Sequence, residues 1–211
     1  MTDVDRRDHL LDVAATILLA MAAVATAWAT YQSSVWRGNQ ARAQSASIAA
    51  RVESTRQTNV ANRDAQVDVA LFTQWVDAYA RGEDELTDFY RKRFRDEFEP
   101  AFEAWIATRP LRNANAPLSP FAMPQYRLAA TAEAERLEEH AAAFSQDVGR
   151  HIQRADNYLL GVVLFAISLF FAALSTRLHT HGSRATLLGM GYVLFVGTAI
   201  WLVTLPIEVS L

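Results

Sequence analysis

The sequence contains no cysteine, which excludes disulfide bonds, iron–sulfur clusters, zinc-thiolate sites and thiol nucleophiles. Lysine is nearly absent too, since Lys92 is the only lysine among 20 basic residues. Glycine occurs eight times, and no Gly-rich loop that would bind a nucleotide phosphate is present. The net charge of −3 is small and no basic face interleaved with aromatic residues occurs, so nucleic acid is excluded as a partner.

Charged residues and histidine are missing from three long runs, residues 13–36, 157–176 and 185–207, which hold 24, 20 and 23 residues. A bilayer core about 30 Å thick is crossed by about 20 helical residues, so each run is long enough to span it. The predicted fold class is an all-α integral membrane protein with three transmembrane helices. A cleaved signal peptide is the alternative for the first run, because Arg6 and Arg7 precede it and small residues at 25–29 fit a cleavage site.

Residues 37–156 predict a helical extramembrane domain between the first two spans, built from long antiparallel helices in a coiled coil. The first helix is expected to reach Gly82, because residues 31–99 contain no proline and only one other glycine. Shorter helices at 83–98 and 101–108, a Pro-rich loop at 109–124 and a second long helix from Gln125 complete the domain. The second helix carries an apolar stripe, and two stripes on the first predict burial on more than one side. The stripes are Leu137, Ala141, Phe144, Val148, Ile152, Ala155 and Leu159; Val67, Leu71, Trp75 and Ala78; and Val69, Phe72, Val76 and Tyr79.

A polar N-terminal tail (residues 1–12), a short basic turn (177–184) and a C-terminal tail (208–211) complete the plan. Arginine in short loops marks the cytoplasmic side of a membrane. The tail holds Arg6 and Arg7, and the turn holds two arginines with His179 and His181. We therefore expect a cytoplasmic N-terminus and an extracytoplasmic middle domain.

Five arginines next to the spans, on the domain side, form a predicted basic collar. A surface of anionic lipid would stabilise such a collar by about 1 kcal/mol per arginine. The alternatives are that these arginines only solvate the adjoining helices, or that they mark this side as cytoplasmic. The basic collar is Arg37, Arg42, Arg51, Arg150 and Arg154.

His140, Asp147 and His151 are spaced i, i+7, i+11, which places them on one face of the second long helix. Imidazole and carboxylate groups on one face could hold a metal or respond to pH between about 5 and 8. The alternative interpretation is a polar flank beside a packed seam. Acidic residues between 83 and 103 lack calcium-loop spacing and are interpreted as a solvated surface. We expect no catalytic residue, cofactor or resident metal.

No ionisable group lies within the three runs, which argues against a secondary transporter. Small residues spaced i, i+4 in the spans favour close helix contacts and a homo-oligomer. We therefore predict a non-enzymatic protein whose helical domain mediates self-association or binds a membrane or envelope protein. The alternative is a homo-oligomeric channel or membrane sensor that responds to lipid or ligand, with a pore lined by Gln32, Ser33 and Ser34 or by Thr198 and Thr204.

Four segments, TAWATYQSSVWRGNQARAQS (26–45), FTQWVDAYARGEDELTDFYRKRF (72–94), PLSPFAMPQYRLAA (117–130) and RADNYLLGVVLFAISLFFAALSTR (154–177), cover much of the chain. Together they resemble a family of uncharacterised bacterial three-span membrane proteins with an N-terminal span, a helical middle and a C-terminal two-span hairpin. The resemblance implies a bacterial plasma membrane location and brings no activity, cofactor or site residue.

Overall fold

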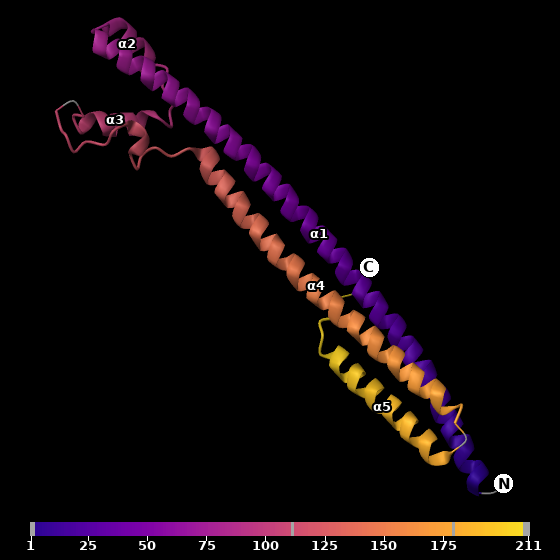
Figure 1. Cartoon of the computed structure of the whole chain (residues 1–211). Coiled ribbons are helices and arrows are strands. Elements are labelled where there is room, and N and C mark those ends of the chain that lie inside the picture. The colour runs from indigo at the N-terminus through magenta and orange to yellow at the C-terminus, as the bar shows by residue number, and fades with distance from the viewer. Residues whose placement is uncertain (1–2, 111, 179, 209–211) are drawn as a thin grey trace. The chain divides into compact units, whose positions relative to one another are not determined.

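The computed structural model describes residues 3–110, 112–178 and 180–208, with side chains from residue 9 onward, and most of these residues are helical. No strand occurs in those ranges. The helices are α1 (Asp3–Arg81), α2 (Asp84–Arg91), α3 (Glu99–Ala107), the 3₁₀ turn η1 (Pro120–Ala122), α4 (Ala129–Ser175) and α5 (His181–Val203), as Figure 1 shows.

Three helices, α1, α4 and α5, each contain a stretch long and apolar enough to cross a membrane. These stretches match the three charge-free runs, so the prediction of an all-α fold with three membrane-length helices is confirmed. The chain divides into two compact units. Unit 1 comprises Met1–Ser45 and Phe144–Leu211, and unit 2 comprises Ala46–Ala143.

Helix α1 ends where the sequence predicts, directly before Gly82. The backbone of Gly82 has φ +69°, a left-handed conformation that glycine adopts at little cost after a helix. The Gly82 amide donates to the carbonyl of Tyr79 at 3.1 Å, which satisfies one of the last carbonyls of α1. The helix begins at Asp3, so from that residue the predicted polar tail is already helical.

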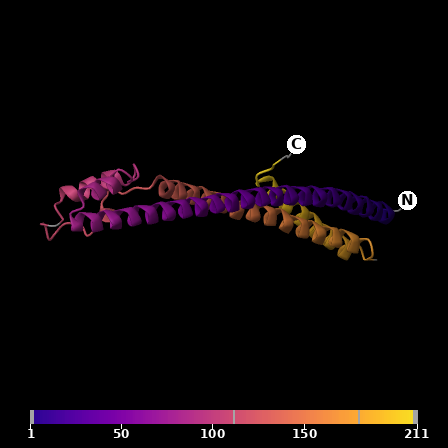
Figure 2. The same cartoon turned by 90° about the horizontal axis from the view of Figure 1, so that it is seen from above.

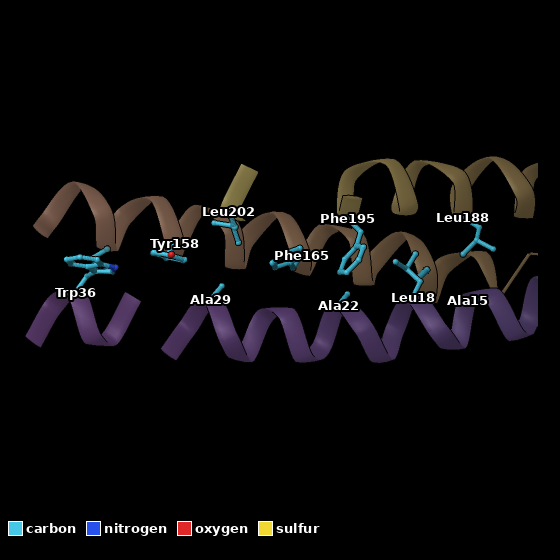
Figure 3. Close-up of a cluster of buried hydrophobic side chains, with 12 residues drawn as sticks. Ala15, Leu18, Ala22, Ala29, Trp36, Tyr158, Phe165, Leu188, Phe195 and Leu202 are labelled. Carbon is cyan, nitrogen blue, oxygen red and sulfur yellow. The ribbon is translucent and has the colours of Figure 1, made fainter. Parts of the chain in front are cut away.

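The core of unit 1 consists of side chains from α1, α4 and α5 that recur every seven residues. Helix α1 contributes mostly alanine, with Leu18 and Trp36, whereas α4 and α5 contribute larger side chains (Figure 3). Figure 2 shows α1 and α4 of this unit side by side, and the Ser33 hydroxyl on α1 donates to the carbonyl of Ala155 on α4 at 3.1 Å. The core residues are Ala15, Leu18, Ala22, Ala29 and Trp36; Ala155, Tyr158, Phe165 and Ala172; and Leu188, Phe195 and Leu202.

Glycine allows α4 and α5 to approach closely within unit 1. A Cβ atom on Gly191 would lie 3.3 Å from the backbone oxygen of Ser168, and the Ser168 hydroxyl donates to the Gly191 carbonyl at 2.8 Å. On the other helix, a Cβ on Gly161 would lie 2.7 Å from a methyl group of Leu202. Small residues at helix contacts serve this purpose in membrane proteins generally.

Polar groups hold the residues that follow α5 against α1 and α4 in unit 1. The buried side chain of Gln32 donates to the carbonyl of Glu208 at 3.1 Å and accepts from its amide at 3.3 Å. Asn39 donates to the Glu208 carboxylate at 2.5 Å, and the Tyr158 hydroxyl donates to the carbonyl of Pro206 at 3.2 Å. Both polar atoms of the buried Gln32 amide are therefore satisfied.

In unit 2, α1 and α4 pack antiparallel through small side chains. The Ser47 hydroxyl donates to the carbonyl of Ala141 at 3.0 Å, and the Ser54 hydroxyl donates to that of Ala134 at 2.9 Å. Both donors and both acceptors are seven residues apart. The buried positions of α1 continue at the same interval, as Ser47, Ser54, Ala61, Asp68 and Trp75.

An aromatic cluster fills unit 2 where α1, α3 and the Pro-rich loop meet. Phe98 and Phe102 are almost fully buried, and the ring of Phe102 lies edge-on to that of Trp75 with centroids 4.8 Å apart. Trp105 donates its indole N–H to the carbonyl of Pro117 at 2.8 Å, which attaches the loop to α3. The buried cluster is Trp75, Phe94, Phe98, Phe102 and Trp105.

Two details of the predicted helices are wrong. The helix expected at 83–98 stops at Arg91, and residues 92–98 form turns before α3. The second long helix begins at Ala129 rather than Gln125. The helix at 101–108 is correct within two residues, as α3.

The predicted apolar stripes are also wrong in part, because large apolar side chains were taken to mark the buried face. On α4, Phe144, Ile152 and Leu159 are exposed, whereas Ala141 and Ala155 are buried as predicted. On α1, Val69, Val76 and Tyr79 of the second stripe, and Val67 of the first, are exposed, so that helix buries one side only. The seam is lined by small residues that a search for large apolar side chains passes over.

We predict that size at position 54 decides the packing of unit 2. Ser54→Ala removes one buried hydrogen bond and should cost about 1 kcal/mol of unfolding free energy. Ser54→Leu must force the helices apart and should cost about 1–3 kcal/mol. Chemical unfolding of the chain in detergent measures both. Ala49→Leu, at an exposed position of the same helix, is the control and should change stability by less than about 0.5 kcal/mol. An equal effect of both leucine variants would contradict the close approach at Ser54.

Candidate functional site

The arginines of the predicted basic collar have separate neighbours within their units. In unit 1, Arg150 pairs with Asp147 at 2.9 Å, Arg42 donates to the Asn39 side-chain oxygen at 3.4 Å, and Arg37 is exposed. The other two arginines of the basic collar are Arg154 and Arg51. The Arg154 guanidinium stacks over the ring of Trp36 at 4.5 Å from its centroid, and Arg51, in unit 2, lies 4.0 Å from the Glu138 carboxylate. A lipid-binding role for the basic collar stays a prediction.

The predicted metal or pH face is divided among different local contacts. His140 lies in unit 2 and contacts Arg136 at 3.4 Å, whereas Asp147 and His151 lie in unit 1. His151 stacks on Trp36 with ring centroids 5.5 Å apart, and its Nδ1 atom is buried without a hydrogen-bond partner among the described residues. In the described part of the chain, no three histidine or acidic side chains converge in a way that could hold a metal ion.

The polar residues predicted to line a pore are mostly satisfied inside unit 1. Gln32 and Ser33 bond to the backbone of Glu208 and Ala155, and the Thr198 hydroxyl donates to the Leu194 carbonyl at 2.8 Å. Ser34 is exposed, and the Thr204 hydroxyl donates to the carbonyl of Trp201 at 2.6 Å. Arg184 of the predicted basic turn lies in the first turn of α5, which begins at His181, and donates to the Asp12 carboxylate. His179 and the side chains of Arg6 and Arg7 lie outside the described residues.

Unit 2 contains an ionic network around Arg95 that the sequence analysis missed. The Arg95 guanidinium donates to Asp68 at 3.1 Å, to Asp64 at 3.0 Å and to Glu97 at 2.6 Å. The Tyr126 hydroxyl also donates to Asp68, at 3.1 Å. These contacts join α1 to the turns before α3 and to the segment that leads into α4. The one sign of this network in the sequence is that Asp68, a charged residue, occupies one of the positions that recur every seven residues along the buried seam.

The network also caps α4. The second carboxylate oxygen of Glu97 accepts a hydrogen bond from the backbone amide of Ala129 at 3.0 Å. Ala129 is the first residue of α4, and the first amides of a helix have no partner within it. A carboxylate at this end is further stabilised by the helix dipole. Glu97 therefore explains why α4 begins at Ala129.

Asp68 is the fully buried member of this network, and its pKa lies above that of an ordinary aspartate. Burial raises the pKa of Asp68, and the hydrogen bond from Tyr126 and the charge of Arg95 only partly oppose this effect. Its Oδ1 atom has no hydrogen-bond partner among the described residues. Burial and the neighbouring Asp68 carboxylate together raise the pKa of Tyr126, which stays a neutral donor.

A second seven-residue pattern, the outer stripe, lies on an exposed face of α1 in unit 2. Its positions alternate by four and three residues, and every side chain is exposed and uncharged. The six charged residues between Ile48 and Thr73 all lie off the stripe. The outer stripe is Ile48, Val52, Thr55, Asn59, Asn62, Gln66, Val69 and Thr73.

The part of α1 that belongs to unit 1 continues the same alternation of four-residue and three-residue steps without a break. Its side chains at these positions are again exposed and uncharged. They are Leu10, Val13, Ile17, Ala20, Val24, Ala27, Tyr31, Ser34, Gly38, Ala41 and Ser45. A count of uncharged residues at the 3.5-residue period, rather than of apolar ones at 3.6, would have found this pattern from the sequence.

Comparisons of the chain with models of protein families, with curated proteins and with solved structures find no match.

We predict that Asp68 makes the stability of the chain depend on pH. Because its pKa is higher in the folded than in the unfolded chain, its contribution is fully present below the unfolded pKa and is lost as pH rises through the folded pKa. Asp68→Asn should remove this contribution, so the stability difference, variant minus wild type, should increase as pH rises from about 4 to 7. Urea unfolding at a series of pH values measures it. Asp96→Asn, at an exposed carboxyl, is the control. A difference that is the same at every pH would contradict the prediction.

Proposed function

We propose that the chain is a non-enzymatic bacterial membrane protein that associates with a second copy of itself through the outer stripe of α1. The exposed, charge-free outer stripe is the observation that carries this proposal. Its alternating spacing of four and three residues is that of the a and d positions in a coiled coil. In such coils, left-handed supercoiling keeps one stripe of each helix facing its partner.

The polar residues of the outer stripe favour an identical partner. In a symmetric parallel pair, Asn59, Asn62 and Gln66 would each face the same residue of the other copy. A side-chain amide is both donor and acceptor, so two copies can bond to each other, whereas a charged residue would repel its own copy. A buried asparagine at such a position also fixes the register of the two helices, at a cost in stability.

The membrane supplies the second argument for a second copy. Helix α1 carries the same spacing through the apolar run at 13–36 and through the polar part of unit 2. A partner that matches both parts must itself carry a helix that changes from apolar to polar at the same position. A second copy anchored in the same bilayer meets this requirement, and their shared topology makes the two α1 helices parallel.

Like charges at the edges of the outer stripe are compensated within each chain. Arg51 and Arg56 flank the stripe on opposite sides and would approach each other in a parallel pair. Arg51 lies 4.0 Å from Glu138, and Arg56 lies 3.4 Å from Glu53. These carboxylates reduce the repulsion that the two arginines would otherwise cause between copies.

We further propose a multi-pass location in a bacterial plasma membrane, with a cytoplasmic N-terminus and with residues 37–156 as an extracytoplasmic domain. The three membrane-length helices and the arginines of the turn at 177–184 support this placement. Lipid contacts through the basic collar and a membrane or envelope protein as an additional partner remain parts of the proposal.

The absence of cysteine allows a direct test by single cysteine substitution. In membranes under mild oxidation, Asn62→Cys should form a disulfide-linked dimer in high yield, because the two copies of this position would face each other within disulfide range. Val52→Cys should do the same. Gln74→Cys, at an exposed position of α1 off the outer stripe, is the matched control and should remain monomeric on a non-reducing gel.

A charge on the outer stripe gives an independent readout. Gln66→Lys should shift the species seen by native mass spectrometry in nanodiscs from dimer to monomer, whereas Gln74→Lys should leave the dimer intact. A wild-type chain that is monomeric at all concentrations, or equal crosslinking of Asn62→Cys and Gln74→Cys, would rule out the proposed interface.

A further inference from the structure

Unit 2 contains a groove of about 560 Å³ formed by α1, α2, α3 and the residues that follow α3. Its apolar part is aromatic, with Trp75, Tyr79, Phe102 and Trp105 among its lining residues. The rings of Trp75 and Tyr79 are stacked with centroids 5.2 Å apart, and Phe102 lies edge-on to Trp75. Pockets of about 300–1,000 Å³ with mostly apolar walls are typical of small-molecule sites.

The polar lining of the groove is predominantly basic. Arg91, Arg109 and Arg112 contribute three guanidinium groups, against the single carboxylate of Asp88. Arg91 already contacts Glu103 at 3.4 Å. Arg109 and Arg112 are exposed and form no ion pair with any residue of the described ranges. Two positive charges at the groove are therefore uncompensated.

We propose that this groove binds a small aromatic carboxylate. The exposed ring of Tyr79, which is stacked on Trp75, would take up a flat ring by stacking. A guanidinium matches a carboxylate through two parallel hydrogen bonds, so Arg109 and Arg112 would hold the anionic end. A neutral molecule of the same shape would leave this charge complementarity unused.

The backbone at Arg109 adds to this assignment. Arg109 follows the C-terminal end of α3 with φ 53°, a left-handed conformation in which glycine is the favoured residue. An arginine at this position therefore costs stability. Arg109→Gly should raise the thermal midpoint of unfolding and weaken carboxylate binding in the same protein.

Naphthalene-2-carboxylate is a suitable probe, titrated by calorimetry into the full chain in nanodiscs of neutral lipid, with empty nanodiscs as the blank. We expect saturable binding of one molecule per chain. Its Kd should be at least about tenfold lower than that of naphthalene-2-methanol, because charge-assisted hydrogen bonds to arginine are lost in the alcohol. Equal affinity for the two probes, or only unsaturable partitioning, would overturn the proposal.

Two variants test charge and shape separately. Replacing both Arg109 and Arg112 by alanine should abolish the preference for the carboxylate, whereas Lys92→Ala, which removes an exposed cation outside the groove, should preserve it. Ile106→Trp, at a 40% exposed position of the groove wall, should fill the groove and weaken both probes. Unchanged carboxylate binding in the double variant or in Ile106→Trp would assign the probe to another place.

Discussion

Small side chains at seven-residue intervals on one face of α1 are the constraint on which both units depend. In unit 1 they are alanines facing the aromatic and aliphatic side chains of α4 and α5, and in unit 2 they include Ser47 and Ser54. A serine hydroxyl reaches the carbonyl of a neighbouring helix only when the two backbones lie close together. If the apolar stretches of unit 1 lie in a bilayer, as proposed, they gain little from the hydrophobic effect, and close packing with hydrogen bonds such as that from Ser33 to Ala155 must hold them together.

A seam of small residues buries little apolar area, and unit 2 compensates at the far ends of its helices. The aromatic cluster around Phe98 and Phe102 supplies the large apolar surfaces that Ser47 and Ser54 cannot. The Arg95 network adds specificity, because its geometry admits one arrangement of α1, the turns before α3 and the segment before α4. Asp68 stands at the junction of the seam and this network.

The sequence allows the large elements to be predicted because their signals are local. A charge-free run of 20 or more residues indicates a membrane-length helix, and the absence of proline with Gly82 at the end indicates the extent of α1. The end of α2 at Arg91 has no such local signal, because Arg95, in the turns that follow, contacts acidic residues 27 and 31 positions away in the chain. No local pattern reports such partners, and the start of α4 depends on Glu97 in the same way.

The buried face was harder to predict than the helices themselves. Both long helices carry more large apolar residues than their buried faces use, and the excess, including Val69 and Phe144, is exposed. On α4 the predicted stripe departs from the seven-residue interval by one residue at Ile152 and Leu159, so both side chains fall outside the contact. The candidate groove could not be predicted from sequence, because its arginines and rings come from four separate segments.

The hydrogen bonds between Gln32 and Glu208 can form only after nearly all of unit 1 has been synthesised. The two residues are 176 positions apart, so the ribosome completes α1 long before the backbone that satisfies the Gln32 amide exists. During that interval the Gln32 amide lacks this partner, and an unpaired amide is costly wherever it is kept from water. A chain that stops before Glu208 therefore keeps a polar defect in the apolar stretch of α1, and the segment that follows α5 removes that defect when it packs against Gln32.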